Sequence, residues 1–155
     1  FCGGEFPRTT YISIRRNLTS GHNFELLTGC DLNSERDQNC VWGYLDVARP
    51  LVTVLAPPCT PFTGWGRRNK IINYQGWLTS YHQAAPHGRF CGHIAMRQMH
   101  NGRFFFSEQP YPSTLYQEAP WPIVRASPSF ASVVLHQQDF FMFLFLTHTP
   151  PPRKS

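Results

Sequence analysis

A short apolar run bounded by prolines constrains the fold of this chain more than any other feature. Residues 51–56 read LVTVLA, with Arg49-Pro50 before them and Pro57-Pro58 after them. A run of this length that is rich in β-branched residues and closed by prolines is typical of a strand buried on both faces. We therefore expect a strand over residues 51–56 with both of its faces covered.

Two further apolar runs indicate strands. Residues 104–106 (FFF) follow the Asn101-Gly102 turn signal, and residues 132–135 read SVVL. Between the first two strands, residues 77–85 precede a predicted helix over 87–100, which we expect to begin at Pro86 and to end at Gly102. A strand-helix-strand order implies parallel strands joined by a right-handed crossover. The expected fold is therefore α/β, with a partial Rossmann-like parallel sheet and a site in the loops that follow the strands.

Upstream of the first strand, residues 31–48 have the features of a helix that Asp31 or Asn33 would cap. Residues 11–14 (YISI) indicate a short strand, and residues 148–155 have the composition of a disordered tail. We expect a single α/β domain over residues 1–147, followed by that tail. The chain begins at Phe1 with no targeting signal, so we expect it to be a fragment.

Composition bounds the partners of this chain. Its 155 residues fit one domain, and its longest apolar run, residues 140–146, is far shorter than the ~20 residues of a membrane-spanning helix. Fourteen Lys and Arg against nine Asp and Glu give a net charge of +5, which permits binding to a polyanion. We expect no membrane partner.

Cysteines and histidines argue against a metal site. The five cysteines are an odd number without a CxxC pair, and none of the seven histidines lies in an HxH or HExxH motif. We expect no bound metal, no disulfide framework and an intracellular, reducing location.

The segment that follows the predicted strand carries a thiol beside a cluster of cations. It reads PPCTPFTGWG over residues 57–66 and continues with Arg67, Arg68 and, after Asn69, Lys70. Prolines lower the entropic cost of holding Cys59 in one geometry, and glycines let a loop pass close to a ligand. Nearby cations favour the thiolate form of a cysteine, and they also attract phosphates.

These residues resemble two motifs of the DNA cytosine-5 methyltransferase family. PPCTPFTGWG is similar to the family's nucleophile loop, Pro-Cys-Gln followed by Phe-Ser and a glycine, with Thr60 in place of the glutamine. The segment FFFSEQP at 104–110 is similar to its second signature, an apolar strand ending in Glu-Asn-Val, with Gln109-Pro110 in place of Asn-Val. The resemblance covers roughly residues 45–112. Within this range the sequence is more similar to methyltransferase-like segments of retroelement polyproteins than to the family's enzymes.

The resemblance implies roles for both motifs. Cys59 would be the nucleophile that adds to carbon 6 of cytosine, and Glu108 would hydrogen-bond or protonate N3. The cations Arg67, Arg68 and Lys70 would bind nucleic acid, DNA rather than RNA, and a DNA-acting protein would be nuclear.

The resemblance also implies a cofactor, S-adenosylmethionine. The family's Phe-x-Gly-x-Gly loop would correspond to Phe1, Gly3 and Gly4, and Asp31 would lie near the adenine ring. Because the chain begins within that loop, we expect this fragment to transfer no methyl group on its own.

Other readings of the same residues stay open. The chain could be a non-catalytic nucleic-acid-binding module of a retroelement polyprotein, or a degenerate fragment without a function. Cys59 could be a small apolar residue in a turn, and Glu108 could pair with Arg103 or Arg125 at the surface. The three cations could lie on a loop that does no more than face solvent.

Overall fold

A computed structural model describes residues 17, 19–134 and 143–144 of the chain. The chain divides into two compact units, Phe1–Pro50 and Leu51–Ser155, and each is described by itself. The predicted strand at 11–14 and the predicted tail at 148–155 lie outside the described residues, and the single domain over 1–147 stays a prediction.

The first unit contains the predicted helix, with a different cap. A 3₁₀ turn, η1 (Leu26–Thr28), precedes the helix α2 (Glu35–Ala48), whose N-cap is Ser34. The carboxylate of Asp31 accepts the Asn33 N–H at 3.0 Å, and the Asp31 carbonyl accepts the Ser34 N–H at 2.8 Å. These bonds form the turn that precedes the helix, and therefore neither Asp31 nor Asn33 caps it. Val41 and Leu45 lie on the buried face of α2.

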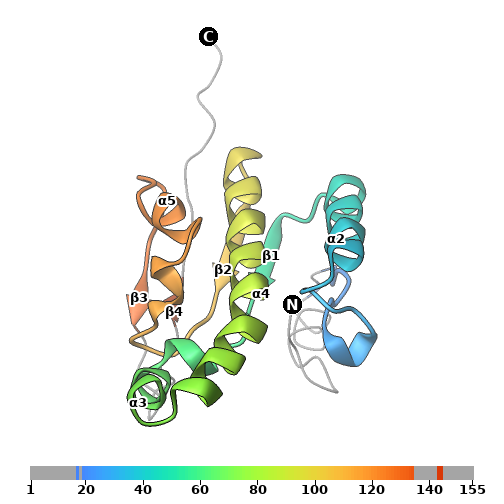
Figure 1. Cartoon of the computed structure of the whole chain (residues 1–155). Coiled ribbons are helices and arrows are strands. Elements are labelled where there is room, and N and C mark those ends of the chain that lie inside the picture. The colour runs from blue at the N-terminus through green and yellow to red at the C-terminus, as the bar shows by residue number, and fades with distance from the viewer. Residues whose placement is uncertain (1–16, 18, 135–142, 145–155) are drawn as a thin grey trace. The chain divides into compact units, whose positions relative to one another are not determined.

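The second unit is built on two parallel strands, β1 (Val52–Leu55) and β2 (Phe104–Ser107). Val52 is paired with Phe104, and Leu55 with Ser107. Both strands and their parallel order confirm the sequence prediction, and the unit is α/β with a small parallel sheet (Figure 1).

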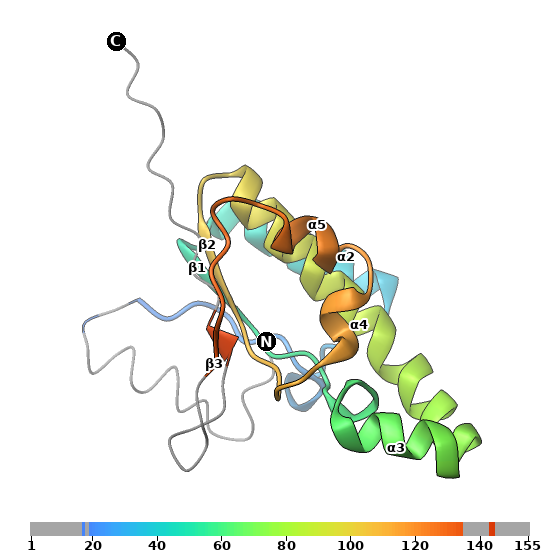
Figure 2. The ribbon, with the colours of Figure 1, turned by 90° about the vertical axis from the view of Figure 1, so that its left-hand side faces the viewer.

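Burial of β1 on both faces was a wrong expectation. Thr53 and Leu55 are 4% and 0% exposed, whereas Val52 and Val54 are 49% and 37% exposed. The buried pair faces the helix α4 (Tyr74–His100), which packs against both strands. The sequence does not distinguish this strand from a fully buried one, because apolar residues occupy both the covered position of Leu55 and the exposed positions of Val52 and Val54. Figure 2 shows α4 and the short helix α5 (Trp121–Arg125) on one side of β1 and β2.

The connection between the strands contains a 3₁₀ turn and two helices: η2 (Thr60–Phe62), α3 (Gly64–Ile72) and α4 (Tyr74–His100). Pro86 lies inside α4, not in its first turn as expected. Both Pro86 and His82, whose carbonyl would have bonded to residue 86, are exposed, and water can replace the lost bond. Gly102 has φ +64° and follows the end of α4, which confirms its predicted role.

The remaining described elements complete this unit. The 3₁₀ helix η3 (Thr114–Gln117) leads to α5, and β3 (Val133–Val134) pairs antiparallel with β4 (Phe143–Leu144). The third predicted strand is thus confirmed over two residues, and β4 lies beside β2. Trp121, with no exposed surface, packs near Phe105 in the core and donates from Nε1 to the Gly88 carbonyl at 2.9 Å. In the parts of the chain that the structure describes, no helix is long and apolar enough to cross a membrane.

Candidate functional site

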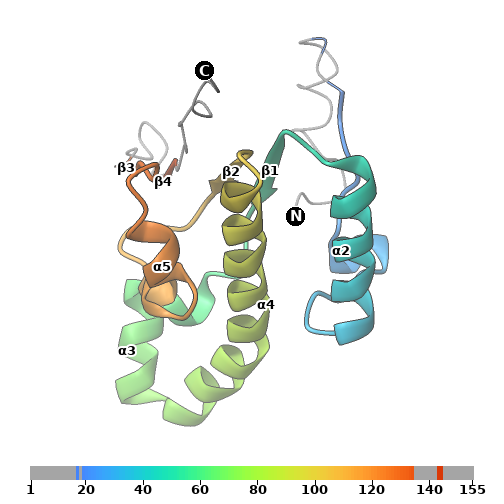
Figure 3. The ribbon, with the colours of Figure 1, turned by 90° about the horizontal axis from the view of Figure 1, so that it is seen from above.

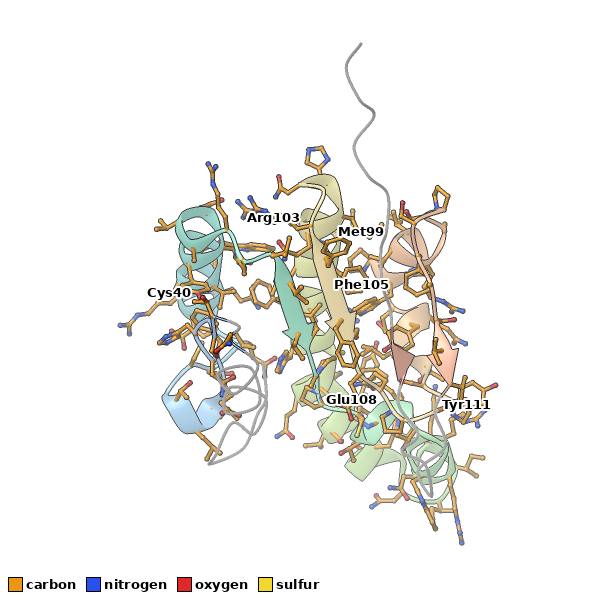
Figure 4. The ribbon with its side chains drawn as sticks, turned by 180° about the vertical axis from the view of Figure 1, so that it is seen from behind. Cys40, Met99, Arg103, Phe105, Glu108 and Tyr111 are labelled. Carbon is orange, nitrogen blue, oxygen red and sulfur yellow. The ribbon has the colours of Figure 1, made fainter. Side chains whose placement is uncertain are left out.

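The two residues that the sequence singles out for chemistry both follow the carboxyl ends of adjacent strands. Leu55 and Ser107 form the last pair of the parallel ladder, and the Glu108 N–H donates to the Leu55 carbonyl at 2.9 Å. Cys59 follows Leu55 by one short segment of loop. Figure 4 shows Glu108 at the end of β2. The strand ends therefore bring the two segments of the candidate site to one edge of the sheet, as expected for parallel strands.

Three side chains hold the backbone of the Cys59 loop. Gln109 Nε2 donates to the Pro57 carbonyl at 2.6 Å, and Trp77 Nε1 donates to the Pro61 carbonyl at 3.1 Å. The Thr114 hydroxyl donates to the Phe62 carbonyl at 3.3 Å. These donors come from the segment after β2, from α4 and from η3. Their bonds fix the loop on both sides of the thiol and keep its backbone carbonyls paired.

Gln109, which sequence reasoning treated only as a departure from a motif, holds the loop that carries Cys59. Its side chain is 1% exposed, and its Oε1 accepts a hydrogen bond from the Ser113 hydroxyl at 3.2 Å. The Ser113 oxygen in turn accepts the Leu115 N–H at 3.2 Å. Gln109 therefore joins the loop after β1 to the start of η3. In the structure the alternating burial of Phe105 and Ser107 continues to Gln109, two residues beyond the end of β2, but no local sequence pattern reports its bond to Pro57.

Glu108 faces away from the core and is exposed. Among the described residues it forms no ion pair, neither with Arg103 nor with Arg125; the ion pair present there joins Arg89 to Glu118 at 3.0 Å. Burial raises the pKa of Tyr116, whose hydroxyl lies 3.3 Å from the Ser107 hydroxyl, and the negative charge of Glu108 raises this pKa further.

Cys59 is a half-buried free thiol, and the cysteines in the described parts differ in accessibility. Cys40 is exposed, Cys30 and Cys59 are half-buried, and Cys91 has no exposed surface. Burial, together with Asp37 and other neighbouring groups, raises the pKa of Cys30 and disfavours its thiolate. Cys40, an exposed thiol in the first unit, can serve as an experimental control for Cys59.

The cations predicted on a loop lie on the helix α3. Thr63 caps this helix, its Oγ1 accepting the Gly66 N–H at 3.3 Å. The expectation that the glycines admit a ligand was wrong for Gly66. A Cβ at Gly66 would lie 2.4 Å from the Pro61 carbonyl oxygen, and the missing side chain lets α3 pack directly on the backbone of η2. Figure 3 shows α3 beside the first turns of α4.

Two of the cations on α3 lie against aromatic rings. The Arg68 guanidinium is 5.6 Å from the centroid of the Trp65 ring, and Lys70 Nζ is 4.5 Å from that of Trp77. Arg67, Arg68 and Lys70 are all exposed. The Trp77 ring also stacks on Tyr81, with 5.2 Å between the ring centroids. Lys70 is therefore directed toward α4, whereas Arg68 lies over Trp65 of its own helix.

The residues expected to bind S-adenosylmethionine do not form a described site. Phe1, Gly3 and Gly4 lie outside the described residues, and Asp31 belongs to the first unit, where its carboxylate accepts the Asn33 N–H. The S-adenosylmethionine contacts therefore stay a prediction.

Comparisons with other proteins add no identity to these observations. No protein-family model matches the chain, and no curated protein or solved structure shows significant similarity to it. Within the described ranges, no group of three or more His, Cys, Asp or Glu side chains could hold a metal ion.

Proposed function

We propose that the chain is a DNA cytosine-5 methyltransferase-like module in which Cys59 and Glu108 act on one cytosine base. The observation that carries the proposal is the position of both residues directly after the ends of adjacent parallel strands, with the Glu108 N–H bonded to the Leu55 carbonyl. The three hydrogen bonds to the Pro57, Pro61 and Phe62 carbonyls, which we call the clamp on the Cys59 loop, support the proposal, because a nucleophile must be held in a fixed geometry.

The proposed chemistry follows from the low reactivity of carbon 5 of cytosine. Its carbon 5 is a poor nucleophile until the Cys59 thiolate adds to carbon 6, forming an S–C6 bond. The electron pair of the C5–C6 double bond moves through the ring toward N3, which receives a proton from the acid form of Glu108. Carbon 5 is then an enamine carbon that takes a proton from solvent. Loss of a proton from carbon 5, departure of the thiolate from carbon 6 and return of the N3 proton to the Glu108 carboxylate restore cytosine and the acid form of Glu108.

The proposal covers activation of the base and ends there. S-adenosylmethionine, when bound, would supply the methyl group to carbon 5, and the proposed contacts for it are Phe1, Gly3, Gly4 and Asp31. Phe1, Gly3 and Gly4 lie outside the described residues, and the steps above use Cys59 and Glu108 alone. The base must be single-stranded or flipped out of a duplex to reach Cys59.

Hydrogen exchange at carbon 5 tests this proposal without a methyl donor. The protein is incubated in D₂O with an oligodeoxynucleotide that contains one cytosine, and deuterium at carbon 5 is measured by mass spectrometry of the digested nucleosides. The parent chain should incorporate deuterium into cytosine above the protein-free rate. Cys59→Ser should abolish this incorporation, because an alcohol does not form the required thiolate.

Cys40→Ser is the matched control, because it removes an exposed thiol from the first unit. It should leave the exchange rate unchanged. Exchange that is lost equally in the Cys40 and Cys59 variants, or that is absent from the parent chain, would contradict the proposal.

A second function, nucleic-acid binding without base chemistry, is favoured by the exposed cations of α3. In this form the chain would be a non-catalytic module, such as one from a retroelement polyprotein, with a nuclear location if its target is DNA. If the chain has this function, the Cys59→Ser variant should bind nucleic acid with the same affinity as the parent chain.

A further inference from the structure

The exposed surface of α3 is unusual for a helix of a globular protein. Trp65, Ile71 and Ile72 are 72%, 85% and 66% exposed, and the following Tyr74 is 50% exposed. Within α3, Gly66 is the buried residue. A helix normally buries its apolar side chains and exposes its polar ones. Here three large apolar side chains face solvent beside two arginines, and the fold gives no reason for this.

The cations and the apolar side chains of α3 share one arc of the helix. Arg68 lies three residues after Trp65 and three and four residues before Ile71 and Ile72, so it is a direct helical neighbour of all three. Arg67 lies four residues before Ile71 and borders the same arc. Lys70 points elsewhere, toward Trp77. We call the arc formed by Trp65, Arg67, Arg68, Ile71 and Ile72 the α3 surface.

The charge around the α3 surface selects an anionic partner. From Val47 to Ser107 the sequence contains no Asp or Glu, and this stretch includes all of α3 and α4. Neither helix therefore carries a carboxylate of its own, and the Glu118 carboxylate, which contacts α4 at Tyr81, is paired there with Arg89. The guanidinium groups suit phosphate, because they can donate two parallel hydrogen bonds to it.

The exposed ring of Trp65 selects a single strand. Within the described residues, the cation that lies over this ring is Arg68, and the ring is otherwise largely exposed. In a duplex both faces of each base are already stacked on neighbouring bases, whereas an unpaired base can stack on an aromatic side chain. A membrane surface fits less well, because helices that bind membranes separate apolar and basic side chains onto opposite faces. On α3, Arg68 lies among the apolar side chains.

We propose that the α3 surface binds a single-stranded polynucleotide, with one base stacked on Trp65 and backbone phosphates on Arg67 and Arg68. This inference deepens the second function proposed above and rests on its nucleic-acid partner. It does not require Cys59 to be reactive. Since α3 packs through Gly66 on the backbone of η2, a strand bound there would lie next to the loop that carries Cys59.

Binding of cytosine-free strands tests the α3 surface separately from the base chemistry. Fluorescence anisotropy with labelled oligothymidylate and oligouridylate measures the affinity for each, and an unlabelled duplex competes in parallel. The parent chain should bind the single strands more tightly than the duplex. Trp65→Ala should weaken binding by about tenfold or more, since stacking on one aromatic contributes a factor of that order, and Trp65→Phe should restore most of it.

The matched control for the ring is Ile123→Ala, which removes an exposed apolar side chain from α5, outside the α3 surface. Its affinity should stay within about twofold of the parent. Because Trp65 and Ile123 are both exposed, neither change should alter folding, which circular dichroism checks.

The matched control for the arginines is the pair Arg36→Ala and Arg125→Ala, which removes two exposed arginines elsewhere. Arg67→Ala with Arg68→Ala should flatten the slope of log affinity against log salt by up to ~1.4, from ~0.7 for each phosphate contact on a single strand. The control pair should leave the slope unchanged. A ratio between the two oligonucleotides tells whether the strand is DNA or RNA.

Three results would overturn this inference. One is a Trp65→Ala variant that binds single strands as tightly as the parent, and another is an equal change of slope in the two arginine pairs. The third is binding to phosphatidylserine vesicles without binding to oligonucleotides, which would assign the α3 surface to a membrane. Loss of carbon 5 exchange with retained, Trp65-dependent binding would reject the base chemistry and leave this inference standing.

Discussion

The Cys59 loop and the helix α3 are neighbours in the sequence, yet the protein treats them in opposite ways. The loop has its carbonyls at Pro57, Pro61 and Phe62 bonded by side chains from elsewhere in the second unit, and Phe62 is 1% exposed. The helix buries Gly66 and leaves its large side chains in solvent. The contrast separates residues that the fold needs from residues that it does not need. The loop is held for position, and the α3 surface is available for contact.

Deleting a large side chain from each region should give the largest difference in stability between the loop and the helix. Phe62→Ala removes a buried ring and should lower the free energy of unfolding by about 3–5 kcal/mol. Ile71→Ala removes an exposed side chain and should change it by no more than about 0.5 kcal/mol. Urea denaturation of both variants measures the difference. Similar losses in the two variants would mean that α3 is as deeply packed as the loop.

Removing the clamp on the Cys59 loop should have the next largest effect. Gln109→Ala leaves the buried Pro57 carbonyl and the Ser113 hydroxyl without their partner, and should cost about 1–3 kcal/mol. The loosened loop should also let Cys59 react faster with iodoacetamide.

Gln75→Ala is the control for this clamp, because it removes the same chemistry from an exposed position. It should change neither stability nor thiol reactivity. If Gln109→Ala alkylates at the parent rate, the clamp does not set the position of the thiol.

The two glycines of α3 should respond to substitution with opposite changes in stability, because their surroundings differ. A Cβ at Gly66 would collide with the backbone of η2, so Gly66→Ala should cost about 1–3 kcal/mol. Nothing lies within 4 Å of a Cβ at Gly64, and Gly64→Ala should stabilise the protein by roughly 0.5–1 kcal/mol. Thermal unfolding of both variants checks the opposite signs. A stabilised Gly66→Ala variant would show that α3 does not pack on η2.

The smallest effect is expected from alkaline pH, which should lower stability by deprotonating the buried Tyr116 beside the end of β2. Because burial raises the pKa of Tyr116 above the ~10 of an unfolded tyrosine, the folded chain keeps this proton where the unfolded chain loses it. The resulting stability is complete below about pH 10, and it declines above that pH by up to ~1.4 kcal/mol per pH unit.

Tyr116→Phe should remove this part of the alkaline decline, while Tyr74→Phe, a change at a half-exposed ring, should retain it. Urea denaturation between pH 9 and 11 compares the three proteins. A decline in the Tyr116→Phe variant as steep as that of the parent would place the titrating group elsewhere.

Much of the sheet and its edge could be predicted from the sequence, because apolar runs between turn residues are local signals. Residues 51–56 and 104–106 predicted two parallel strands, and Gly102 predicted the end of α4. The same signals do not say what covers a strand, and the exposed face of β1 was therefore missed. Pro86 was read as a helix start because the solvent position that tolerates a proline inside a helix depends on the tertiary packing.

The candidate site shows the same division. Cys59 and Glu108 were found from local motifs, and the structure places both after adjacent strands. α3 was read as a loop because Gly64 and Gly66 weaken a helical pattern, while the reason for Gly66 is a contact with η2. Gln109 acts on Pro57, far away in sequence, and no local pattern reports such a bond.

The central claim is that Cys59 and Glu108 act on the same base, and a double-mutant cycle on carbon 5 exchange tests it most directly. Exchange rates are measured for the parent chain, Cys59→Ser, Glu108→Gln and the double variant. Two residues that serve one addition step are not independent, so each single variant should lose most of the exchange and the double variant should lose little more. Independent losses that multiply in the double variant, or a Glu108→Gln variant that exchanges like the parent, would contradict the claim.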